Sequence, residues 1–135
     1  CQEVFLKDNG NLVNHHPSKI GGKSDRRLAA FSRMEAVADS LLAAGAGRIV
    51  SVGDFNDDLW HSGGHGTIKY NGKWEKIDGH FTYGQVSVQE DVFDDPPLLT
   101  RDKVFGGLKP RRTFVGPKYE GGLSDHLPVA LMVTF

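Results

Sequence analysis

A chain of 135 residues has the length of one domain, and a domain of this size buries roughly two-thirds of the surface of its unfolded chain. The 16 basic and 17 acidic residues nearly cancel, which excludes a protein that coats nucleic acid with positive charge and leaves room only for a local basic patch. The single cysteine, Cys1, excludes an internal disulfide and a cysteine-rich metal site, and no stretch reaches the ~18 apolar residues of a membrane span. We therefore expect one domain over residues 1–135.

The first predicted element is a β-hairpin. Residues 3–7 and 11–16 read as extended segments on either side of the polar turn at residues 8–10. Alternation along the second strand places Val13 and His15 on one face, and Leu12, Asn14 and His16 on the other. One of the two histidines is thus expected to point into a site while the other packs or faces water.

A helix follows the loop at residues 17–23. Ser24 is the expected N-cap, and the helix is expected from about residue 25 to residue 44, where Gly45 and Gly47 end it. Apolar residues at helical spacing predict an amphipathic helix that lies on a sheet. These core positions are Phe31, Met34, Ala38, Leu41 and Leu42.

The apolar run at residues 48–52 is the next strand, and residues 53–57 (GDFND) follow it directly. A strand, a helix and a strand in this order predict an α/β layered fold, with a right-handed crossover if the two strands are parallel. Asp54, Asn56 and Asp57 then lie at the carboxyl end of a strand, where sites of α/β proteins usually form.

The second half of the chain is expected to be mostly strands. Residues 67–70 and 74–83 read as strands around an Asn71-Gly72 turn, and Val86, Val88 and Val92 continue as a strand up to the break at residues 94–97. Residues 100–112 read as irregular and basic. A short extended piece at residues 113–115 and a final strand at residues 127–135 complete the chain.

Polar side chains gather at the ends of these strands. They form the clusters Asn14-His15, Asp54 with Asn56, and Asp125-His126, and Asp78 lies within a further strand. Carboxylates bind hard cations such as magnesium, and a carboxylate beside a histidine fixes the tautomer of its ring. Taken one at a time, each residue fits a turn or an ordinary strand position better than a site. Together they are the parts of metal-assisted phosphoester hydrolysis.

Four motifs in this order carry a resemblance to a known family. Residues 14–19 (NHHPSK), 53–57 (GDFND), 76–78 (KID) and 124–129 (SDHLPV) resemble the C-terminal half of the endonuclease/exonuclease/phosphatase superfamily, which includes DNase I, abasic-site endonucleases, inositol-phosphate phosphatases and sphingomyelinases. Residues 111–122 also resemble bacterial members of unassigned substrate. The resemblance implies an α/β fold: half of a DNase I-like two-sheet sandwich, with a mainly antiparallel or mixed sheet and an outer helix.

The resemblance also implies roles for single residues. His126 would activate the attacking water with Asp78 hydrogen-bonded to it, and Asp125 would be a carboxylate on the metal side. Asp54 would position the nucleophile or the leaving oxygen, Asn56 would contact the phosphate, and His15 would stabilise or protonate the phosphoryl group. The implied cofactor is Mg²⁺, with Mn²⁺ as a substitute, and the implied substrate is a phosphoester, nucleic acid among the candidates.

One part of the family pattern has no counterpart in this sequence. The first half of the family domain contributes a strand-end asparagine and a metal-binding glutamate, and Glu3, Glu35 and Glu75 do not match that motif. We therefore expect a fragment of a longer protein, or a chain that needs an N-terminal half or a second copy to cover its sheet. The alternative to an enzyme is a non-catalytic remnant or interaction module that cannot assemble the metal centre.

Three weaker signals complete the sequence. Residues 22–24 (GKS) before the helix resemble the end of a phosphate-binding P-loop, but the required first glycine falls on Pro17. His61 and His65 have the spacing of zinc ligands on a helix, yet the glycines around them favour a loop. The basic residues of 103–118 either steer an anionic substrate or form a solvated loop. For Trp60, Trp74 and Tyr119 we expect core or rim packing, with packing on a substrate as the alternative.

Overall fold

The computed structural model describes residues 2–6, 9–59 and 64–134. The chain forms two compact units, each assembled from separate stretches. The first unit contains Cys1–Asp57, Asp78–Gln89 and Leu131–Phe135, and the second contains Asp58–Ile77 and Glu90–Ala130. Among the described helices, none combines the length and the apolar character that a membrane crossing requires.

A four-stranded sheet is the centre of the first unit. Its strands are β1 (Gln2–Leu6), β2 (Asn9–His15), β3 (Arg48–Asp54) and β6 (Asp78–Gly84), in the order β1-β2-β3-β6. β2 pairs with β1 antiparallel and with β3 parallel, and β6 pairs with β3 antiparallel. The expected mixed sheet is confirmed.

The first hairpin differs from the prediction in its turn. Asn9 and Gly10 belong to β2, opposite Leu6 and Phe5, while Lys7 and Asp8 lie outside the described residues. Gly10 is buried, and a Cβ added there would lie 3.2 Å from Cγ1 of Ile49. The absence of a side chain at Gly10 therefore leaves space for the core side chain of Ile49, and Gly10 does not form the predicted turn.

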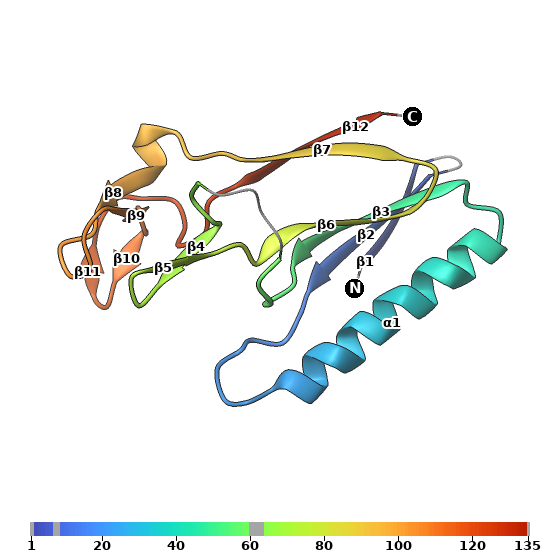
Figure 1. Cartoon of the computed structure of the whole chain (residues 1–135), viewed down its shortest axis with the longest axis horizontal. Helices are drawn as coiled ribbons and strands as arrows, with labels where there is room; N and C mark the ends of the chain where they lie inside the picture. The colour runs from blue at the N-terminus through green and yellow to red at the C-terminus, as the bar shows by residue number, and fades with distance from the viewer. Residues whose placement is uncertain (1, 7–8, 60–63, 135) are drawn as a thin grey trace. The chain divides into compact units, whose positions relative to one another are not determined.

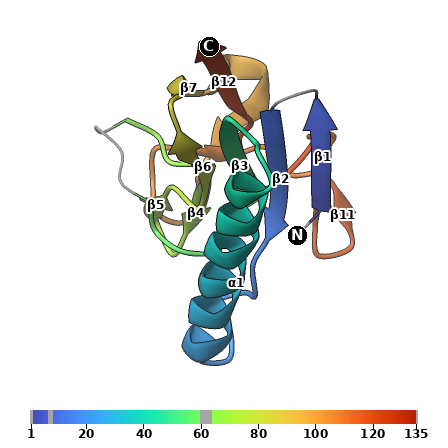
Figure 2. The ribbon, with the colours of Figure 1, turned by 90° about the vertical axis from the view of Figure 1, so that its right-hand side faces the viewer.

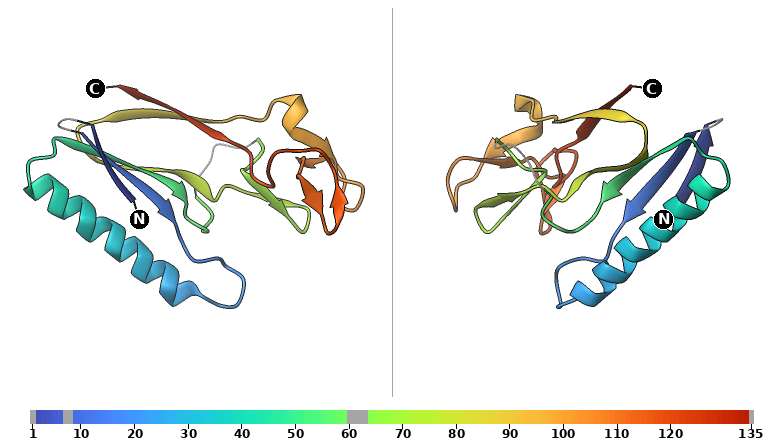
Figure 3. Two further views of the ribbon diagram at one scale, coloured as in Figure 1. Left: turned by 180° about the vertical axis from the view of Figure 1, so that it is seen from behind. Right: turned by 45° about the vertical axis from the view of Figure 1, so that its right-hand side comes forward.

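Helix α1 (Ser24–Ala43) lies along one face of this sheet (Figures 1 and 2). The two views of Figure 3 show the same arrangement. The N-cap is Lys23 and not Ser24, because Ser24 is already helical and no side chain caps the first turn. At the other end the N–H of Gly45, with φ +101°, donates to the carbonyl of Leu42, so the helix ends where predicted.

The core of the first unit lies between α1 and the sheet. The helix buries Met34, Val37 and Ala38, while its predicted core residues Phe31, Leu41 and Leu42 are half-buried. The sheet contributes Leu12 and Ile49, whereas Val50 is buried on the opposite face of the sheet. Phe31, Phe55 and Phe81 pack together, with ring centroids 4.9 to 5.9 Å apart.

The second unit consists of short hairpins. β4 (Ile68–Tyr70) and β5 (Lys73–Glu75) pair across Asn71 and Gly72, whose φ angles of 47° and 79° confirm the predicted tight turn. β8 (Leu99–Arg101) pairs with β9 (Leu108–Pro110), and β10 (Phe114–Val115) with β11 (Lys118–Tyr119). The prediction that residues 100–112 are irregular is wrong, because this stretch contains β8's last residues and β9.

The predicted strand over residues 74–83 is in fact two strands, β5 and β6, separated by Lys76 and Ile77. The N–H of Lys76 donates to Asp58 Oδ1 at 3.2 Å, and the N–H of Ile77 donates to Thr67 Oγ1 at 3.1 Å. Side chains therefore take the backbone donors that a continuous strand would use. The remaining elements are η1 (Pro96–Leu98) and the two-stranded sheet of β7 (Ser87–Val92) with β12 (Val129–Thr134).

Candidate active site

Three strands bring polar side chains into one row. His15 ends β2, Asp54 ends β3 and Asp78 begins β6, and the register pairs His15 with Asp54 and Asp54 with Asp78. β2 and β3 are parallel, so their carboxyl ends meet at one edge of the sheet, and the antiparallel β6 starts at that same edge. Residues far apart in the sequence thus become direct neighbours.

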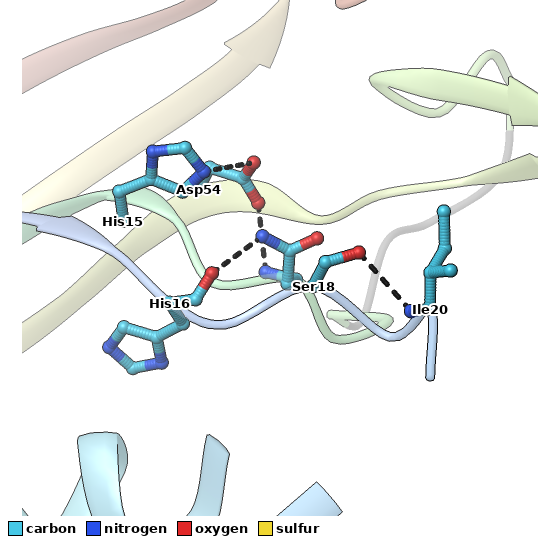
Figure 4. A network of polar contacts seen from close by, with 6 residues as sticks. His15, His16, Ser18, Ile20 and Asp54 are labelled. Atoms are coloured by element: carbon cyan, nitrogen blue, oxygen red, sulfur yellow. Dashed lines mark hydrogen bonds and ion pairs between the residues drawn. The ribbon is translucent and has the colours of Figure 1, made fainter. Parts of the chain in front are cut away.

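His15 and Asp54 face each other across the first of these pairs. His15 Nε2 lies 3.6 Å from Asp54 Oδ2, and the two side chains point toward one another in Figure 4. The His15 side chain is 80% exposed and that of Asp54 only 19%. The imidazole can therefore reach a bound molecule while it stays beside the carboxylate.

A tight turn after β3 holds the Asp54 carboxylate. Asp54 Oδ1 accepts a hydrogen bond from the N–H of Asn56 at 2.8 Å, and Asn56 adopts the left-handed conformation with φ 51°. Asn56 Nδ2 donates to the carbonyl of His16 at 2.7 Å, and the side chain of Phe55 between them is fully buried. The turn role of GDFND and its place in the site are therefore compatible.

Asp54 and Asp78 form a pair of carboxylates on adjacent strands. Each offers an oxygen within 4.8 Å of the other, and both side chains are only partly exposed. Like charges directly opposite each other in a sheet are destabilising. Two converging carboxylates are also the donor set that a hard divalent cation prefers, so the residues present fit Mg²⁺ or Mn²⁺.

The strand alternation predicted for β2 is confirmed. Leu12, Asn14 and His16 are buried, whereas Val13 and His15 are exposed. Asn14 Nδ2 donates to Ser51 Oγ at 2.7 Å and to the Val52 carbonyl at 3.2 Å, so Asn14 fastens β2 to β3 from the core side.

His16 belongs to the core. Its ring packs edge-on against Phe31 and Phe55, with centroids 4.5 and 5.1 Å apart. Burial, together with the neighbouring His15, lowers the pKa of His16 and keeps its ring neutral. Of the two adjacent histidines, only His15 is placed for chemistry.

Asp125 and His126 lie in the second unit, in the segment before β12. The N–H of His126 donates to Ser124 Oγ at 3.0 Å, and the N–H of the buried Leu127 donates to the Thr67 carbonyl at 2.7 Å. These bonds give the segment a defined backbone conformation. Asp125 is exposed and lines a pocket together with residues next to the β10–β11 hairpin.

Several ion pairs among the described residues of the second unit, including the two that follow, were not predicted from the sequence. Lys69 Nζ lies 3.0 Å from Asp102 Oδ2, with both side chains 5% exposed. His65 Nδ1 lies 2.9 Å from Asp94 Oδ2, and the His65 ring packs on Trp74 with centroids 4.7 Å apart. No local pattern marks either pair, since the partners come from separate hairpins or loops. Trp60 and His61 lie outside the described residues.

The sequence profile of the Endonuclease/Exonuclease/phosphatase family matches residues 58–134, more than half of the chain. The chain belongs to the endonuclease/exonuclease/phosphatase family. No curated protein matches it. Membership in this family confirms the resemblance, and two of the four motifs that carry it, residues 76–78 and 124–129, lie within the matched stretch.

A solved structure from the same family has a related fold. The chain resembles the crystal structure of an endonuclease/exonuclease/phosphatase family protein from Bacteroides thetaiotaomicron, with 22% identity and a TM-score of 0.50. The match covers 93% of this chain and 50% of the other. The expected fold class, half of the family's α/β architecture, is thus confirmed, and the chain spans about half the length of that relative.

Proposed function

We propose that the protein is a metal-dependent phosphoester hydrolase, acting as a nuclease, phosphodiesterase or phosphatase. The observation that carries this proposal is the pairing of Asp54 with Asp78 across β3 and β6, with His15 beside Asp54. A repulsive carboxylate pair at the edge of a sheet is explained by a cation that both carboxylates bind.

The cation is Mg²⁺, or Mn²⁺ as a substitute. Asp54 and Asp78 would hold it, and the resemblance adds Asp125 as a further carboxylate on the metal side. When bound, such an ion offsets the negative charge that develops on the phosphoryl oxygens.

The other residues handle protons and orientation. His126 would accept a proton from the attacking water, with the Asp78 carboxylate orienting its ring, and Asp54 would position the attacking or leaving oxygen. His15 would donate a hydrogen bond or a proton to the phosphoryl group. Asn56 would contact the phosphate, for which the tight turn after β3 supplies a fixed backbone.

The first experiment measures cation binding without any substrate. We expect the melting temperature of the protein to rise on titration with MgCl₂ or MnCl₂, and the rise to vanish in Asp54→Asn and Asp78→Asn. Both variants should melt above the wild type when divalent ions are removed by a chelator, because the substitution relieves the carboxylate repulsion. The matched control is Asp39→Asn, an exposed carboxylate on α1.

The second experiment measures turnover of a panel of phosphodiesters and phosphomonoesters. His126→Ala and Asp54→Ala should lower turnover by roughly 10³-fold or more while the protein stays folded. Near-normal turnover in both variants would refute the assignment.

A second candidate function rests on the 50% coverage of the solved relative. A chain that represents half of a family domain can be a non-catalytic remnant or interaction module, which would bind no divalent ion at Asp54 and Asp78. We propose instead that a further half of the domain, encoded before Cys1 or supplied by a second copy, completes the site. Turnover that appears only when such a half is added, together with cation binding by this chain alone, would separate the two candidates.

A further inference from the structure

A pocket of about 330 Å³ lies within the second unit, directly beside the Asp125-His126 segment. This volume is at the lower end of the range found for small-molecule sites. One wall comes from the start of the β10–β11 hairpin and the other from the residues before His126. The lining residues are Arg112, Thr113, Phe114, Leu123, Ser124 and Asp125.

Direct hydrogen bonds hold the two walls together. The N–H of Gly122 donates to the Arg112 carbonyl at 3.0 Å, and Thr113 Oγ1 donates to the Leu123 carbonyl at 3.1 Å. A Cβ at Gly122 would overlap the carbonyl of Arg111, so the two segments are in close backbone contact. The pocket is therefore built into the fold and is not formed by side chains alone.

The basic residues around the hairpin differ in their partners. Lys118 pairs with Glu120 at 2.9 Å, and Arg111 Nε donates to the Glu120 carbonyl at 3.1 Å. Arg112 is half-buried, and its guanidinium forms no ion pair or hydrogen bond with the residues that the structure describes. A partly buried cation in a pocket wall is stabilised when an anion binds beside it, because burial of an unpaired charge costs free energy.

The rest of the lining orients such an anion. Ser124 Oγ accepts the N–H of His126, which leaves its hydroxyl proton free to be donated to a ligand. The Asp125 carboxylate repels an anion from its part of the lining but accepts hydrogen bonds from hydroxyl groups. A phosphorylated sugar, with its phosphate at Arg112 and hydroxyls at Asp125, satisfies all three side chains.

We propose that this pocket binds a second phosphate of the substrate, carried on the sugar unit next to the scissile phosphoester, and that Arg112 is the residue that selects for it. The proposal rests on the proposed function, because it is the adjoining Asp125-His126 segment that makes the pocket a substrate subsite. Phe114, which is 57% exposed, supplies an apolar wall against which the sugar packs.

The test is a binding titration that needs neither turnover nor a metal. Ribose 5-phosphate is added to the wild type in the absence of divalent ions and followed by NMR, with ribose as the neutral comparison. We expect ribose 5-phosphate, and not ribose, to shift the amide signals of Thr113, Leu123 and Ser124. Arg112→Ala should weaken binding by roughly tenfold and Arg112→Lys by less, since lysine keeps the charge without the planar donor pair.

The matched control is Lys103→Ala, which removes the same charge from an exposed side chain outside the pocket. It should bind ribose 5-phosphate like the wild type. Equal weakening in Lys103→Ala, unchanged binding in Arg112→Ala, or no binding by the wild type would each overturn the proposal.

A second arm separates this proposal from the proposed function. Thymidine 5′-(p-nitrophenyl phosphate) is compared with its 3′-phosphorylated form as substrates. We expect the wild type to prefer the 3′-phosphorylated form in kcat/KM, and Arg112→Ala to bring the ratio close to one. Specific binding of ribose 5-phosphate without turnover of either substrate, even after the further half of the domain is added, would refute the hydrolase and leave the pocket standing.

Discussion

His15 and His16 are neighbours in the sequence with opposite environments. The His15 ring is in solvent beside Asp54, and the His16 ring is in the core against Phe31 and Phe55. Strand geometry causes the difference, because successive side chains of β2 point to opposite faces of the sheet. The two positions therefore predict separate effects on activity and on stability.

Substituting each histidine by alanine tests this separation. His15→Ala should lower kcat of the active protein by about 10²-fold or more and leave the melting temperature unchanged, because a proton donor is lost and no packing is disturbed. His16→Ala should lower the free energy of unfolding by about 2–4 kcal/mol, because it opens a cavity among aromatic rings. Urea denaturation and steady-state kinetics on both variants provide the measurements, and a reversed pattern would contradict the assignment of faces.

Much of the candidate site could be predicted at this scale, for a physical reason. Carboxylates and histidines directly after apolar strands are local patterns, and alternation along β2 assigns His15 and His16 to their faces without any tertiary information. The partnership of Asp54 with Asp78 could not be predicted from the residues alone, since it depends on which strand β6 joins. The roles of Asp125 and His126 remain predictions drawn from the resemblance.

At the scale of elements, Gly53 allows β3 to pair with β2 at a position where a side chain would not fit. This residue has φ +143°, and a Cβ there would overlap the backbone carbonyl of Asn14. The absence of a side chain at Gly53 allows the ladder to continue to the His15–Asp54 pair. A side chain at this position would force apart the two strands that carry the site.

Gly53→Ala should therefore lower the free energy of unfolding by about 3 kcal/mol or more, since backbone strain and a backbone clash add. Gly45→Ala is the control, because Gly45 also has a positive φ but open space around it. In Gly45→Ala only backbone strain is expected, and it should lower the free energy of unfolding by about 1 kcal/mol. Equal losses in the two variants would show that the contact with Asn14 does not matter.

The loop between β8 and β9 is organised by one carboxylate. Asp102 Oδ1 accepts the N–H groups of Val104 and Phe105, and Oδ2 pairs with Lys69. The N–H of Phe105 and the Lys69 ammonium lower the pKa of Asp102 from 3.8 to about 2. The charged carboxylate thus stabilises the fold above pH 4, and this stabilisation is lost as the pH falls from about 4 to about 2.

Asp102→Asn tests this pH dependence. The variant should have a lower melting temperature than the wild type at pH 7. This difference in melting temperature should narrow between pH 4 and pH 2, where the wild type also loses the charge. Melting curves by circular dichroism at several pH values measure it. Asp95→Asn, an exposed carboxylate, should show no such difference, and a difference for Asp102→Asn that stays constant down to pH 2 would contradict this account.

The elements predicted well are those with a local cause. Periodicity gives the hairpin, α1 and β3, and Asn71-Gly72 gives the β4–β5 turn. The errors lie where hydrogen bonds or ion pairs between residues distant in the sequence determine the local structure. Examples are Ile77, whose N–H donates to Thr67, and Asp102, whose carboxylate pairs with Lys69. The alternating pattern of a strand cannot reveal that one of its backbone N–H groups donates to a side chain elsewhere in the chain.

At the scale of the whole molecule, the chain represents half of the length of its solved relative. Large apolar side chains such as Leu28, Met132 and Leu123 are 66 to 81% exposed. Exposed apolar surface of this kind favours association. We propose that a second copy or a further half of the domain covers part of it.

Light scattering on the purified chain tests this proposal. The apparent mass should exceed that of the 14.8 kDa chain and rise with concentration. Met132→Lys and Leu123→Lys should reduce association, whereas Lys73→Ala, at an exposed polar position, should not. A monodisperse monomer of this mass across the concentration range would contradict coverage by a second copy.

The division of the chain into interleaved units bears on how the protein can be shortened. The stretch that matches the family profile starts at residue 58, at the boundary between the two units, but it includes β6, whose partner β3 lies before that boundary. A protein trimmed to residues 58–134 would keep Asp78 and lose Asp54, and it would leave the β6 edge open to intermolecular pairing. The smallest piece that keeps the β3–β6 pair together is therefore larger than the stretch that matches the family profile.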